Sequence, residues 1–365
     1  MTVVIDTERA RALRGGLARQ LADAGHDRRW VGAVEAVPRH LFVPAFHQQG
    51  STGEWERISA GDTGYLDGVY ADRALTTQLT DTVPTSSSSE PDLMLTMLDA
   101  LEVSPGHRVL EVGTGTGYNA ALLAHVLGDV NVTTIDVDPE LTTLAAERLR
   151  AAGYNPAVHT GDGAVGVASQ APFDRIIATC GMQSIPWRWV EQAADGAVMV
   201  VPIGWGLAKI TVRAGRAEGR FLPEGAYFMA RRAPGAEPRF AGLENIQPST
   251  TKVPVAGLLD RLRFPLALAL PGYRSCTWSD DATGELEALG IWMPDGSTAT
   301  AHVDGTVRQL GLTGLWDVIE QLDSQFSTTP AREDFGLTLT PATQRAWWKS
   351  EDGPGWELPL TAFAA

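Results

Sequence analysis

Residues 108–119 read RVLEVGTGTGYN, and this stretch decides the fold. The apolar run Val109–Val112 is followed by glycines at every second position, and a helical pattern opens at Tyr118. This order indicates a buried strand, a tight turn and a helix, with backbone that can approach a ligand closely. A dinucleotide-binding loop needs the spacing G-x-G-x-x-G, and Tyr118 stands where its third glycine would be. A nicotinamide or flavin ligand is therefore disfavoured.

Short apolar runs alternate with helical segments on the carboxyl side of this stretch. The runs cover residues 130–135, 175–179 and 197–201. Short buried strands that alternate with helices are typical of a doubly wound, mostly parallel sheet. The sequence therefore predicts an α/β fold of this kind, with the glycine loop at the end of its first strand.

Acidic side chains stand at the ends of the next two predicted strands. Asp136 ends the second strand, where it can accept hydrogen bonds from both hydroxyls of a ribose. Asp162 ends the third strand, where it can accept from an adenine amino group. The carboxyl ends of adjacent parallel strands form one crevice, so we expect these groups to meet the glycine loop. Simpler roles stay open: Asp136 as a helix N-cap, Asp162 as a turn residue, and the glycines as a turn without a ligand.

Together these residues favour S-adenosylmethionine as the cofactor. The glycine loop faces carboxylates and no P-loop lysine follows it, which argues against a phosphate-rich ligand. Glu111 either orders the loop or reaches the ligand. The candidate cofactor-binding residues are Glu111, Gly113, Thr114, Gly115, Gly117, Tyr118, Asn119, Asp136, Asp162 and Gly163.

The composition excludes several classes of protein. Among 365 residues, 29 Lys and Arg stand against 44 Asp and Glu, a net charge of −15, so nucleic acid is not an expected partner. The 2 cysteines, Cys180 and Cys276, predict neither a metal site nor a set of disulfides, and a cytoplasmic location fits them best. No apolar run is long enough for a membrane span, and no export signal is expected.

The regions outside the predicted sheet differ from it in pattern. Residues 7–46 show helical spacing, residues 47–68 read as an inserted loop, and the last third of the chain predicts an additional α+β domain. The serine tract, Thr85–Ser89, precedes an amphipathic helix and stands where a helix N-cap is expected. The predicted division is an N-terminal helical and substrate-side segment (1–90), a ligand-binding core (91–234) and a C-terminal accessory domain (235–365).

Several motifs, in order, resemble those of the protein-L-isoaspartate (D-aspartate) O-methyltransferase family. The similar segments are VPRHLFVP at 37–44, VYADRAL at 69–75, VLEVGTGTGYN at 109–119, FDRIIAT at 173–179 and GAVMVVPIG at 196–204. This resemblance covers about residues 1–215, and it implies a Rossmann-like class I methyltransferase that uses S-adenosylmethionine.

The resemblance also points to the serine tract as the reacting side of the site. In that family a serine-containing segment ending in x-Pro precedes the helix before the glycine loop, and the tract with Pro91 stands in that place. Ser89 aligns with the family's functional serine, and Ser88 and Ser87 are further candidate catalytic residues. Helix capping is the alternative role for these serines. Arg39, in the first motif, is expected to be a structural ion-pair partner.

Methyl transfer to a carboxylate sets modest chemical demands. An Asp side chain is already ionised at neutral pH, so no general base is needed. The enzyme has to hold the carboxylate near the methyl group, and hydroxyls orient an anionic nucleophile without neutralising it as a cationic clamp would. The serine tract is suited to that task.

Three features depart from the family's minimal pattern: the 47–68 insertion, the serine tract itself and the C-terminal extension. This architecture resembles a bacterial branch associated with ribosomally made, modified peptides such as lanthipeptides and graspetides. The implied substrate is a peptide or protein bearing Asp or isoaspartate, and the ester of a dedicated peptide would collapse to an aspartimide. General isoaspartyl repair is the alternative. A non-catalytic peptide-binding scaffold is disfavoured, because the glycine loop, acidic strand ends and serine tract are all present. The oligomeric state is not predicted.

Overall fold

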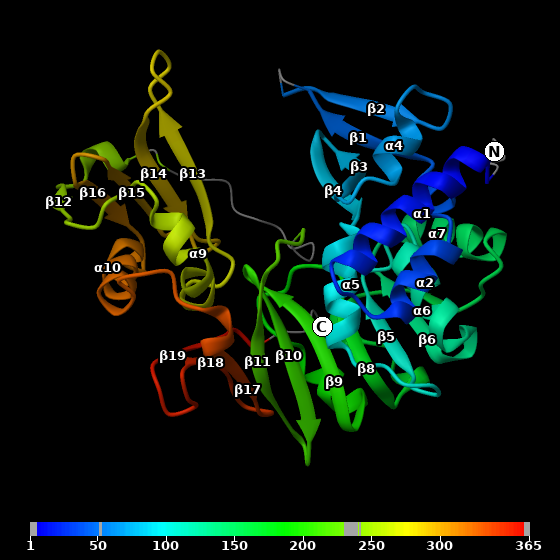
Figure 1. Ribbon diagram of the computed structural model, residues 1–365. Helices are drawn as coiled ribbons and strands as arrows, with labels where there is room; N and C mark the ends of the chain where they lie inside the picture. The colour runs from blue at the N-terminus through cyan, green and yellow to red at the C-terminus, as the bar shows by residue number, and fades with distance from the viewer. Residues whose placement is uncertain (1–5, 51–52, 230–239, 241, 361–365) are drawn as a thin grey trace.

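A ten-stranded mixed sheet forms the centre of the structure, a computed structural model that describes residues 6–50, 53–229, 240 and 242–360. Its strand order is β19-β18-β17-β11-β10-β9-β8-β5-β6-β7 (Figure 1). The strands from β9 to β7 run parallel, and those from β19 to β10 run antiparallel to their neighbours. The predicted doubly wound α/β fold is thereby confirmed. The strands are β5 (Val109–Val112), β6 (Val132–Asp136), β7 (Ala157–Thr160), β8 (Phe173–Ala178), β9 (Ala193–Ile203), β10 (Gly206–Arg213), β11 (Arg216–Gly225), β17 (Phe335–Leu339), β18 (Gln344–Trp348) and β19 (Gly355–Glu357).

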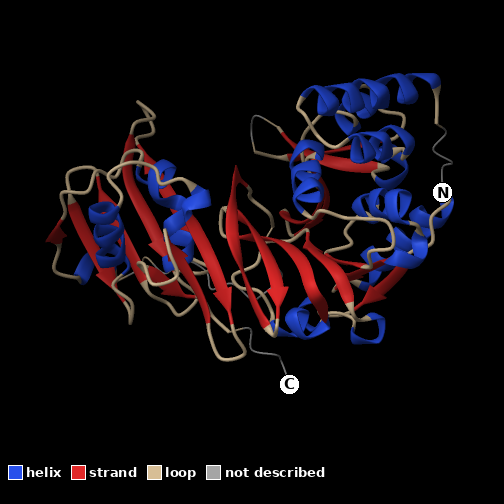
Figure 2. Cartoon of the chain, turned by 60° about the horizontal axis from the view of Figure 1, so that its bottom comes forward, coloured by secondary structure: helices blue, strands red, loops and turns tan. Residues whose placement is uncertain are grey.

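Helices cover both faces of the parallel strands because successive side chains of each strand point to opposite faces. Ile176 belongs to one buried apolar cluster and its neighbour Ile177 to the other. Figure 2 shows helices gathered over the parallel strands and again over the C-terminal sheet, with antiparallel strands between them. The helices around the core are α1 (Glu8–Asp23), α2 (Arg28–Ala36), α3 (Arg39–Phe42), α5 (Pro91–Ala100), α6 (Tyr118–Leu127), α7 (Pro139–Ala151) and α8 (Trp187–Gln192).

A small antiparallel sheet of order β2-β1-β3-β4 lies on the N-terminal side. The expectation of a loop over 47–68 is wrong, because this segment contributes to a hairpin and to a short helix, α4 (Tyr65–Val69). Few of the hairpin's side chains are buried, so its sequence is polar and looks like a loop. The strands are β1 (Ala45–Gln49), β2 (Trp55–Ser59), β3 (Leu75–Thr80) and β4 (Val83–Ser88).

The serine tract forms most of β4 and does not cap a helix. The N-cap of α5 is Glu90, which makes no side-chain capping bond. Instead Asp72, from a remote segment, accepts a hydrogen bond from the backbone N–H of Asp92 at 2.9 Å. The expected capping role for the serines is therefore wrong, and their side chains are available for other contacts.

The C-terminal region contains a five-stranded antiparallel sheet of order β12-β16-β15-β14-β13. The α+β composition expected for the last third of the chain is confirmed. Strands β17 to β19, however, join the central sheet beside β11, so these late residues extend the core, and the division at residue 235 stays a prediction. The elements are α9 (Leu258–Ala269), α10 (Leu315–Gln325), β12 (Ser249–Thr250), β13 (Arg274–Ser279), β14 (Leu286–Trp292), β15 (Thr298–His302) and β16 (Thr306–Leu310).

Aromatic packing joins the C-terminal helices to the central sheet. The ring of Phe264 in α9 meets that of Phe221 in β11 edge-on at 4.9 Å between centroids, and that of Phe335 in β17 at 5.1 Å. All three side chains belong to one buried cluster that continues under the parallel strands. Among the described residues, no helix has both the length and the apolar character needed to cross a membrane.

Candidate functional site

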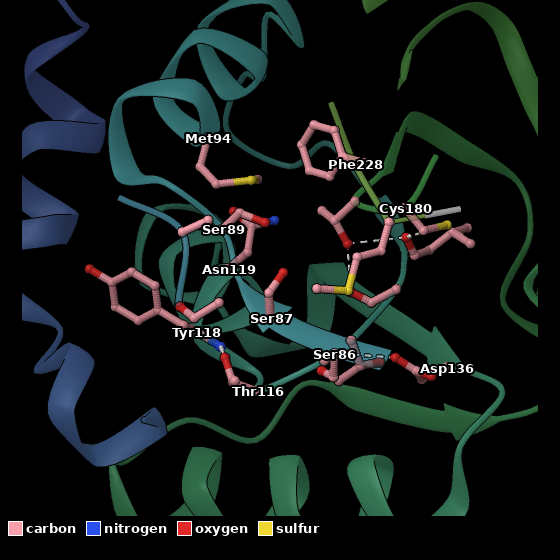
Figure 3. Close-up of a pocket in the computed structure, with 18 of the residues that line it drawn as sticks. Ser86, Ser87, Ser89, Met94, Thr116, Tyr118, Asn119, Asp136, Cys180 and Phe228 are labelled. Carbon is pink, nitrogen blue, oxygen red and sulfur yellow. Dashed lines mark hydrogen bonds between the residues drawn. The ribbon is translucent and has the colours of Figure 1, made fainter. Parts of the chain in front are cut away.

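A cavity of about 420 Å³ lies at the carboxyl ends of β5 and β6, between the glycine loop and the serine tract (Figure 3). Its volume is in the range of small-molecule sites. The predicted crevice is therefore present. It is lined by most of the residues that the sequence singled out, namely Gly113, Thr114, Gly115, Tyr118, Asn119, Asp136, Asp162, Gly163, Ser87, Ser88 and Ser89.

The glycine loop has a backbone conformation that larger residues would strain. Gly113 has φ +105°, and a Cβ on it would lie 2.6 Å from Thr179 Oγ1. Gly115 has φ +51°, and a Cβ there would approach the carbonyl of Ser87 to 3.5 Å. Gly113 thus lets the loop pack closely against Thr179, and Gly115 keeps the loop free of a side chain on the side of the serine tract. Gly117 does not line the cavity; it precedes α6 with φ +88° and packs against Ala145.

Asp136 ties the second strand to the glycine loop. Its Oδ2 accepts a hydrogen bond from the backbone N–H of Gly115 at 2.9 Å, and its Oδ1 accepts from that of Asp138 at 3.2 Å. The N-cap of α7 is Asp138, so the alternative capping role does not apply to Asp136. A carboxylate oxygen has more than one lone pair, so both oxygens can still accept from a ribose.

Asp162 combines the two roles that the sequence left open. Its Oδ1 accepts a hydrogen bond from the backbone N–H of Ala164 at 2.9 Å and caps a short 3₁₀ turn. Its side chain also lines the cavity, on the strand next to Asp136. Turn formation here fixes the carboxylate at the edge of the cavity.

Glu111 orders the loop from below and does not line the cavity. It is completely buried, and it accepts hydrogen bonds from Asn119 Nδ2 at 2.7 Å and from Thr134 Oγ1 at 2.6 Å. Thr134 Oγ1 lies 2.7 Å from Thr114 Oγ1. Burial raises the pKa of Glu111 to about 7; the two hydrogen bonds act against this shift, and the charge of Asp136 adds to it. Of the two roles given for Glu111, the structure supports loop ordering.

Alternate serines of the tract face opposite ways, as in any strand. The Ser88 hydroxyl is buried and accepts hydrogen bonds from Arg39 at 3.2 and 3.3 Å. Ser87 and Ser89 line the cavity on the other side, with Met94 and Phe228 nearby (Figure 3). Within the described residues, neither of these two hydroxyls is hydrogen-bonded to protein. They are therefore free to donate to a bound anion.

Arg39 is the main support of the serine tract. Its guanidinium is completely buried and donates to five carbonyl oxygens, and burial lowers its pKa to about 10. The expected structural role is confirmed but the expected acidic partner is wrong, because its partners are carbonyl groups and the Ser88 hydroxyl. The carbonyls belong to Val69, Ala71, Arg73, Ser88 and Ser89.

Several cavity residues carry little or no signal in the sequence. Tyr227 and Phe228 follow β11, and Thr179 follows β8, so only the folded sheet brings them to the loop. Glu90, between the serine tract and Pro91, also lines the cavity. Burial, and then the charges of Asp72 and Asp92, raise the pKa of Glu90. The x in the Ser-x-Pro pattern marks Glu90, and Thr179 ends the similar segment at 173–179, whereas nothing local marks Tyr227 or Phe228.

The residues present fit S-adenosylmethionine. Two neighbouring strand ends, at β6 and β7, offer carboxylates to hydroxyl and amino donors. The loop after β5, next to β6, has no side chain at Gly113 and Gly115. The described lining contains no Lys, Arg or His, so it lacks the usual partners of a phosphate chain. The arrangement suits an adenosyl ligand without phosphates.

Asp136→Ala should weaken S-adenosylmethionine binding by about 10- to 100-fold. The variant loses charge-assisted hydrogen bonds to the ribose, each worth about 1.5–3 kcal/mol, and also releases Gly115. Asp138→Asn is the matched control, because it alters a carboxylate two residues away that does not line the cavity. Calorimetry on both variants measures the effect. Equal affinity in Asp136→Ala and the unchanged protein would exclude the ribose contact.

Comparison with known proteins reveals extensive similarity over the first two thirds of the chain. A model of the protein-L-isoaspartate(D-aspartate) O-methyltransferase family matches residues 14–222. The protein-L-isoaspartate O-methyltransferase of Koribacter versatilis is 37% identical over 187 residues, covering 51% of this chain and 73% of that protein. The enzyme of the same name from Roseiflexus castenholzii is 36% identical over 188 residues, with coverages of 51% and 75%. That of Cytophaga hutchinsonii is 32% identical over 195 residues, with coverages of 53% and 77%.

The similarity of fold reaches further than that of sequence. A solved structure named protein-L-isoaspartate O-methyltransferase aligns with a TM-score of 0.56 at 19% identity. The alignment covers 92% of this chain and 100% of the other chain. Coverage of that extent includes most of the C-terminal region, so that region has a counterpart in a solved fold.

Proposed function

Because this chain belongs to the protein-L-isoaspartate(D-aspartate) O-methyltransferase family, and is a methyltransferase that uses S-adenosylmethionine, we propose that it methylates an aspartyl side chain of a dedicated peptide. The proposed product is a methyl ester that closes to an aspartimide as the peptide matures. The partner is thus a peptide bearing Asp or isoaspartate.

The polar groups on the cavity wall support a carboxylate as the methyl acceptor. Two hydroxyls, of Ser87 and Ser89, face the cavity without protein partners, and the described lining contains no cationic side chain. Hydroxyl donors orient an anionic oxygen and leave it nucleophilic, whereas an ion pair with a cationic side chain would lower its nucleophilicity. No general base is needed for an acceptor with a pKa near 4.

The site residues divide the work of the reaction between them. S-Adenosylmethionine supplies an electrophilic methyl group when bound. The glycine loop and Asp136 fix the adenosyl side of the cavity, and Ser87 and Ser89 hold one carboxylate oxygen by hydrogen bonds. The other carboxylate oxygen forms the new bond to the methyl carbon as the sulfur–carbon bond breaks. Arg39 keeps the serines in place through their carbonyl groups.

Aspartimide formation follows from the ester without further help. The backbone nitrogen of the next residue attacks the ester carbonyl, a carbon–nitrogen bond forms, and methanol leaves with the amide proton. The five-membered ring contains the former side-chain carbonyl. Compared with the starting Asp, the peptide has lost one water.

Features outside the cavity support a dedicated peptide. The β1–β2 hairpin and the C-terminal sheet add surface beyond the methyltransferase core, which suits selection of one shaped substrate. We place the reaction in the cytoplasm, where the thiols of Cys180 and Cys276, which form no disulfide, would stay reduced.

General isoaspartyl repair is the second candidate, and one observation favours it. The solved protein-L-isoaspartate O-methyltransferase aligns over 92% of this chain, so a C-terminal region of this fold is not peculiar to peptide maturation. Both candidates share the methyl-transfer step, and they differ in the acceptor.

A three-substrate assay separates the two. The protein is incubated with methyl-labelled S-adenosylmethionine and one of three peptides: an isoaspartyl peptide, its normal Asp twin, or a modified precursor encoded near the gene. Label on the precursor's ordinary Asp, with loss of one water by mass later, supports dedicated maturation. Label on the isoaspartyl peptide alone supports repair and contradicts maturation. No label on any peptide contradicts carboxyl methylation.

Ser89→Ala should lower kcat roughly 100-fold, because the carboxylate loses a positioned donor. S-Adenosylmethionine binding should stay within about twofold, since Asp136 and the glycine loop hold that ligand. Ser104→Ala, at an exposed serine outside the cavity, is the control. Initial rates under saturating substrate and calorimetry provide the two readouts. Full turnover by Ser89→Ala would remove this serine from the mechanism.

A further inference from the structure

The ring of Tyr227 is an exposed aromatic surface on the wall of the cavity. Its side chain is 66% exposed, whereas its neighbours Ala226 and Phe228 are 5% and 8% exposed. It lines the same cavity as Ser87 and Ser89. The two buried neighbours anchor the segment, and Tyr227 alone turns outward.

This ring is held rigidly from behind. It stacks on Trp205, with 4.4 Å between ring centroids and an interplanar angle of 23°. The guanidinium carbon of Arg263 lies 4.4 Å from the centroid of the same indole. Arg263 and Tyr227 both pack against Trp205, and we call these three side chains the aromatic platform. Tyr227 is its most exposed member, and the ring face that does not stack on Trp205 is called its free face.

Backbone hydrogen bonds fix both ends of the segment that carries Tyr227. The N–H of Ala226 donates to the carbonyl of Trp205 at 3.3 Å, and the N–H of Gly181 donates to the carbonyl of Met229 at 2.8 Å. The platform is therefore preorganised. When a ligand stacks on it, the protein would lose little conformational entropy.

The platform lies on the acceptor side of the cavity. The segment that carries Tyr227 is hydrogen-bonded to Gly181, which follows β8. Strand β8 lies on the opposite side of β5 from β6, the strand that ends in Asp136 at the ribose end. Arg263 belongs to α9, so the C-terminal region contributes to this side of the site. A group bound here would belong to the substrate and not to S-adenosylmethionine.

We propose that the free face of Tyr227 is a specificity subsite that stacks an aromatic side chain of the peptide substrate, at a residue flanking the acceptor. The inference rests on the proposed function, in that the acceptor belongs to a peptide. The planar ring of an aromatic substrate residue can stack on the preorganised ring of Tyr227 in the offset geometry that aromatic pairs adopt. It would also cover most of the exposed apolar surface of Tyr227.

A matched peptide series tests this subsite. Acceptor peptides share one sequence and carry Phe, Leu, Lys or Gly at each position flanking the acceptor in turn. At one flanking position, the unchanged protein should show a kcat/KM about fivefold higher for Phe than for Gly, because the KM of the Phe peptide is lower. In Tyr227→Ala this ratio should fall to about one, and in Tyr227→Phe it should persist, because the stacking ring is kept. Leu312→Ala, at a 95% exposed residue outside the cavity, should keep the full ratio.

The alternative outcomes are distinct from one another. Methylation with equal kcat/KM for Phe and Gly overturns the subsite but leaves the proposed function intact. A preference for Lys overturns an aromatic ligand and assigns a cation to the platform. An equal loss on every peptide in Tyr227→Ala, or weaker S-adenosylmethionine binding, shows a general structural role and overturns the proposal. Absence of methylation on every peptide contradicts the proposed function and the subsite with it.

Discussion

Replacing Arg39 with methionine should lower the free energy of unfolding by about 3–5 kcal/mol, the largest effect we expect from one substitution. Methionine has a similar length but no donors, so five carbonyl oxygens and the Ser88 hydroxyl lose their shared partner. The guanidinium is completely buried, so little water is available to replace it. Two of these carbonyls belong to Ser88 and Ser89, so kcat should fall as well.

Denaturant unfolding of three variants checks the role of Arg39. Arg39→Lys should fall between the unchanged protein and Arg39→Met, because an ammonium group has three donors and cannot reach all the acceptors. Ser88→Ala should cost only about 1 kcal/mol, since it removes one acceptor. If Arg39→Met unfolds at the same denaturant concentration as the unchanged protein, the guanidinium is not the support that its contacts indicate.

Glu111→Gln should remove a loss of stability that the unchanged protein shows between about pH 4.5 and pH 7. In the unfolded chain this carboxyl gives up its proton near the ordinary glutamate pKa of 4.5, whereas burial in the fold raises the pKa to about 7. Between these values the folded state binds one proton more, so stability falls as pH rises. The shift corresponds to roughly 3 kcal/mol, present in full below the lower pKa and lost above the upper one.

Unfolding curves across this pH range, without S-adenosylmethionine, give the comparison for Glu111. Glutamine keeps the shape of the side chain and can still bond Asn119 or Thr134, but it does not titrate. Glu54→Gln, at an exposed carboxylate in the β1–β2 turn, should follow the pH dependence of the unchanged protein. The same slope in Glu111→Gln and the unchanged protein would show that Glu111 does not titrate in this range.

The sequence predicted the parts of the site that lie at the carboxyl ends of successive strands. Gly113, Gly115, Asp136 and Asp162 follow from short-range patterns, because parallel strands bring their carboxyl ends to one edge of the sheet. The cavity contains all four. The same reasoning predicted the parallel strands and the short strands of the C-terminal sheet.

The remaining features depend on contacts between distant segments. The serine tract looked like a helix cap because β3, which makes it a strand, is recognised only by pairing. Arg39 has carbonyl partners from two different segments, 69–73 and 88–89, and backbone acceptors leave no mark in a sequence. Tyr227 reaches the cavity through the register of β10 and β11, which no local pattern specifies.

The late strands β17 to β19 also determine when the central sheet can be completed during synthesis. Strand β11 ends at Gly225, and its partner β17 begins only at Phe335. While the ribosome translates the intervening residues, β11 is an open edge with unpaired backbone groups that neighbouring nascent chains can bind. The central sheet therefore keeps an open edge at β11 until the strands from β17 onward have been synthesised, so its final strand order is reached only after the intervening residues are translated.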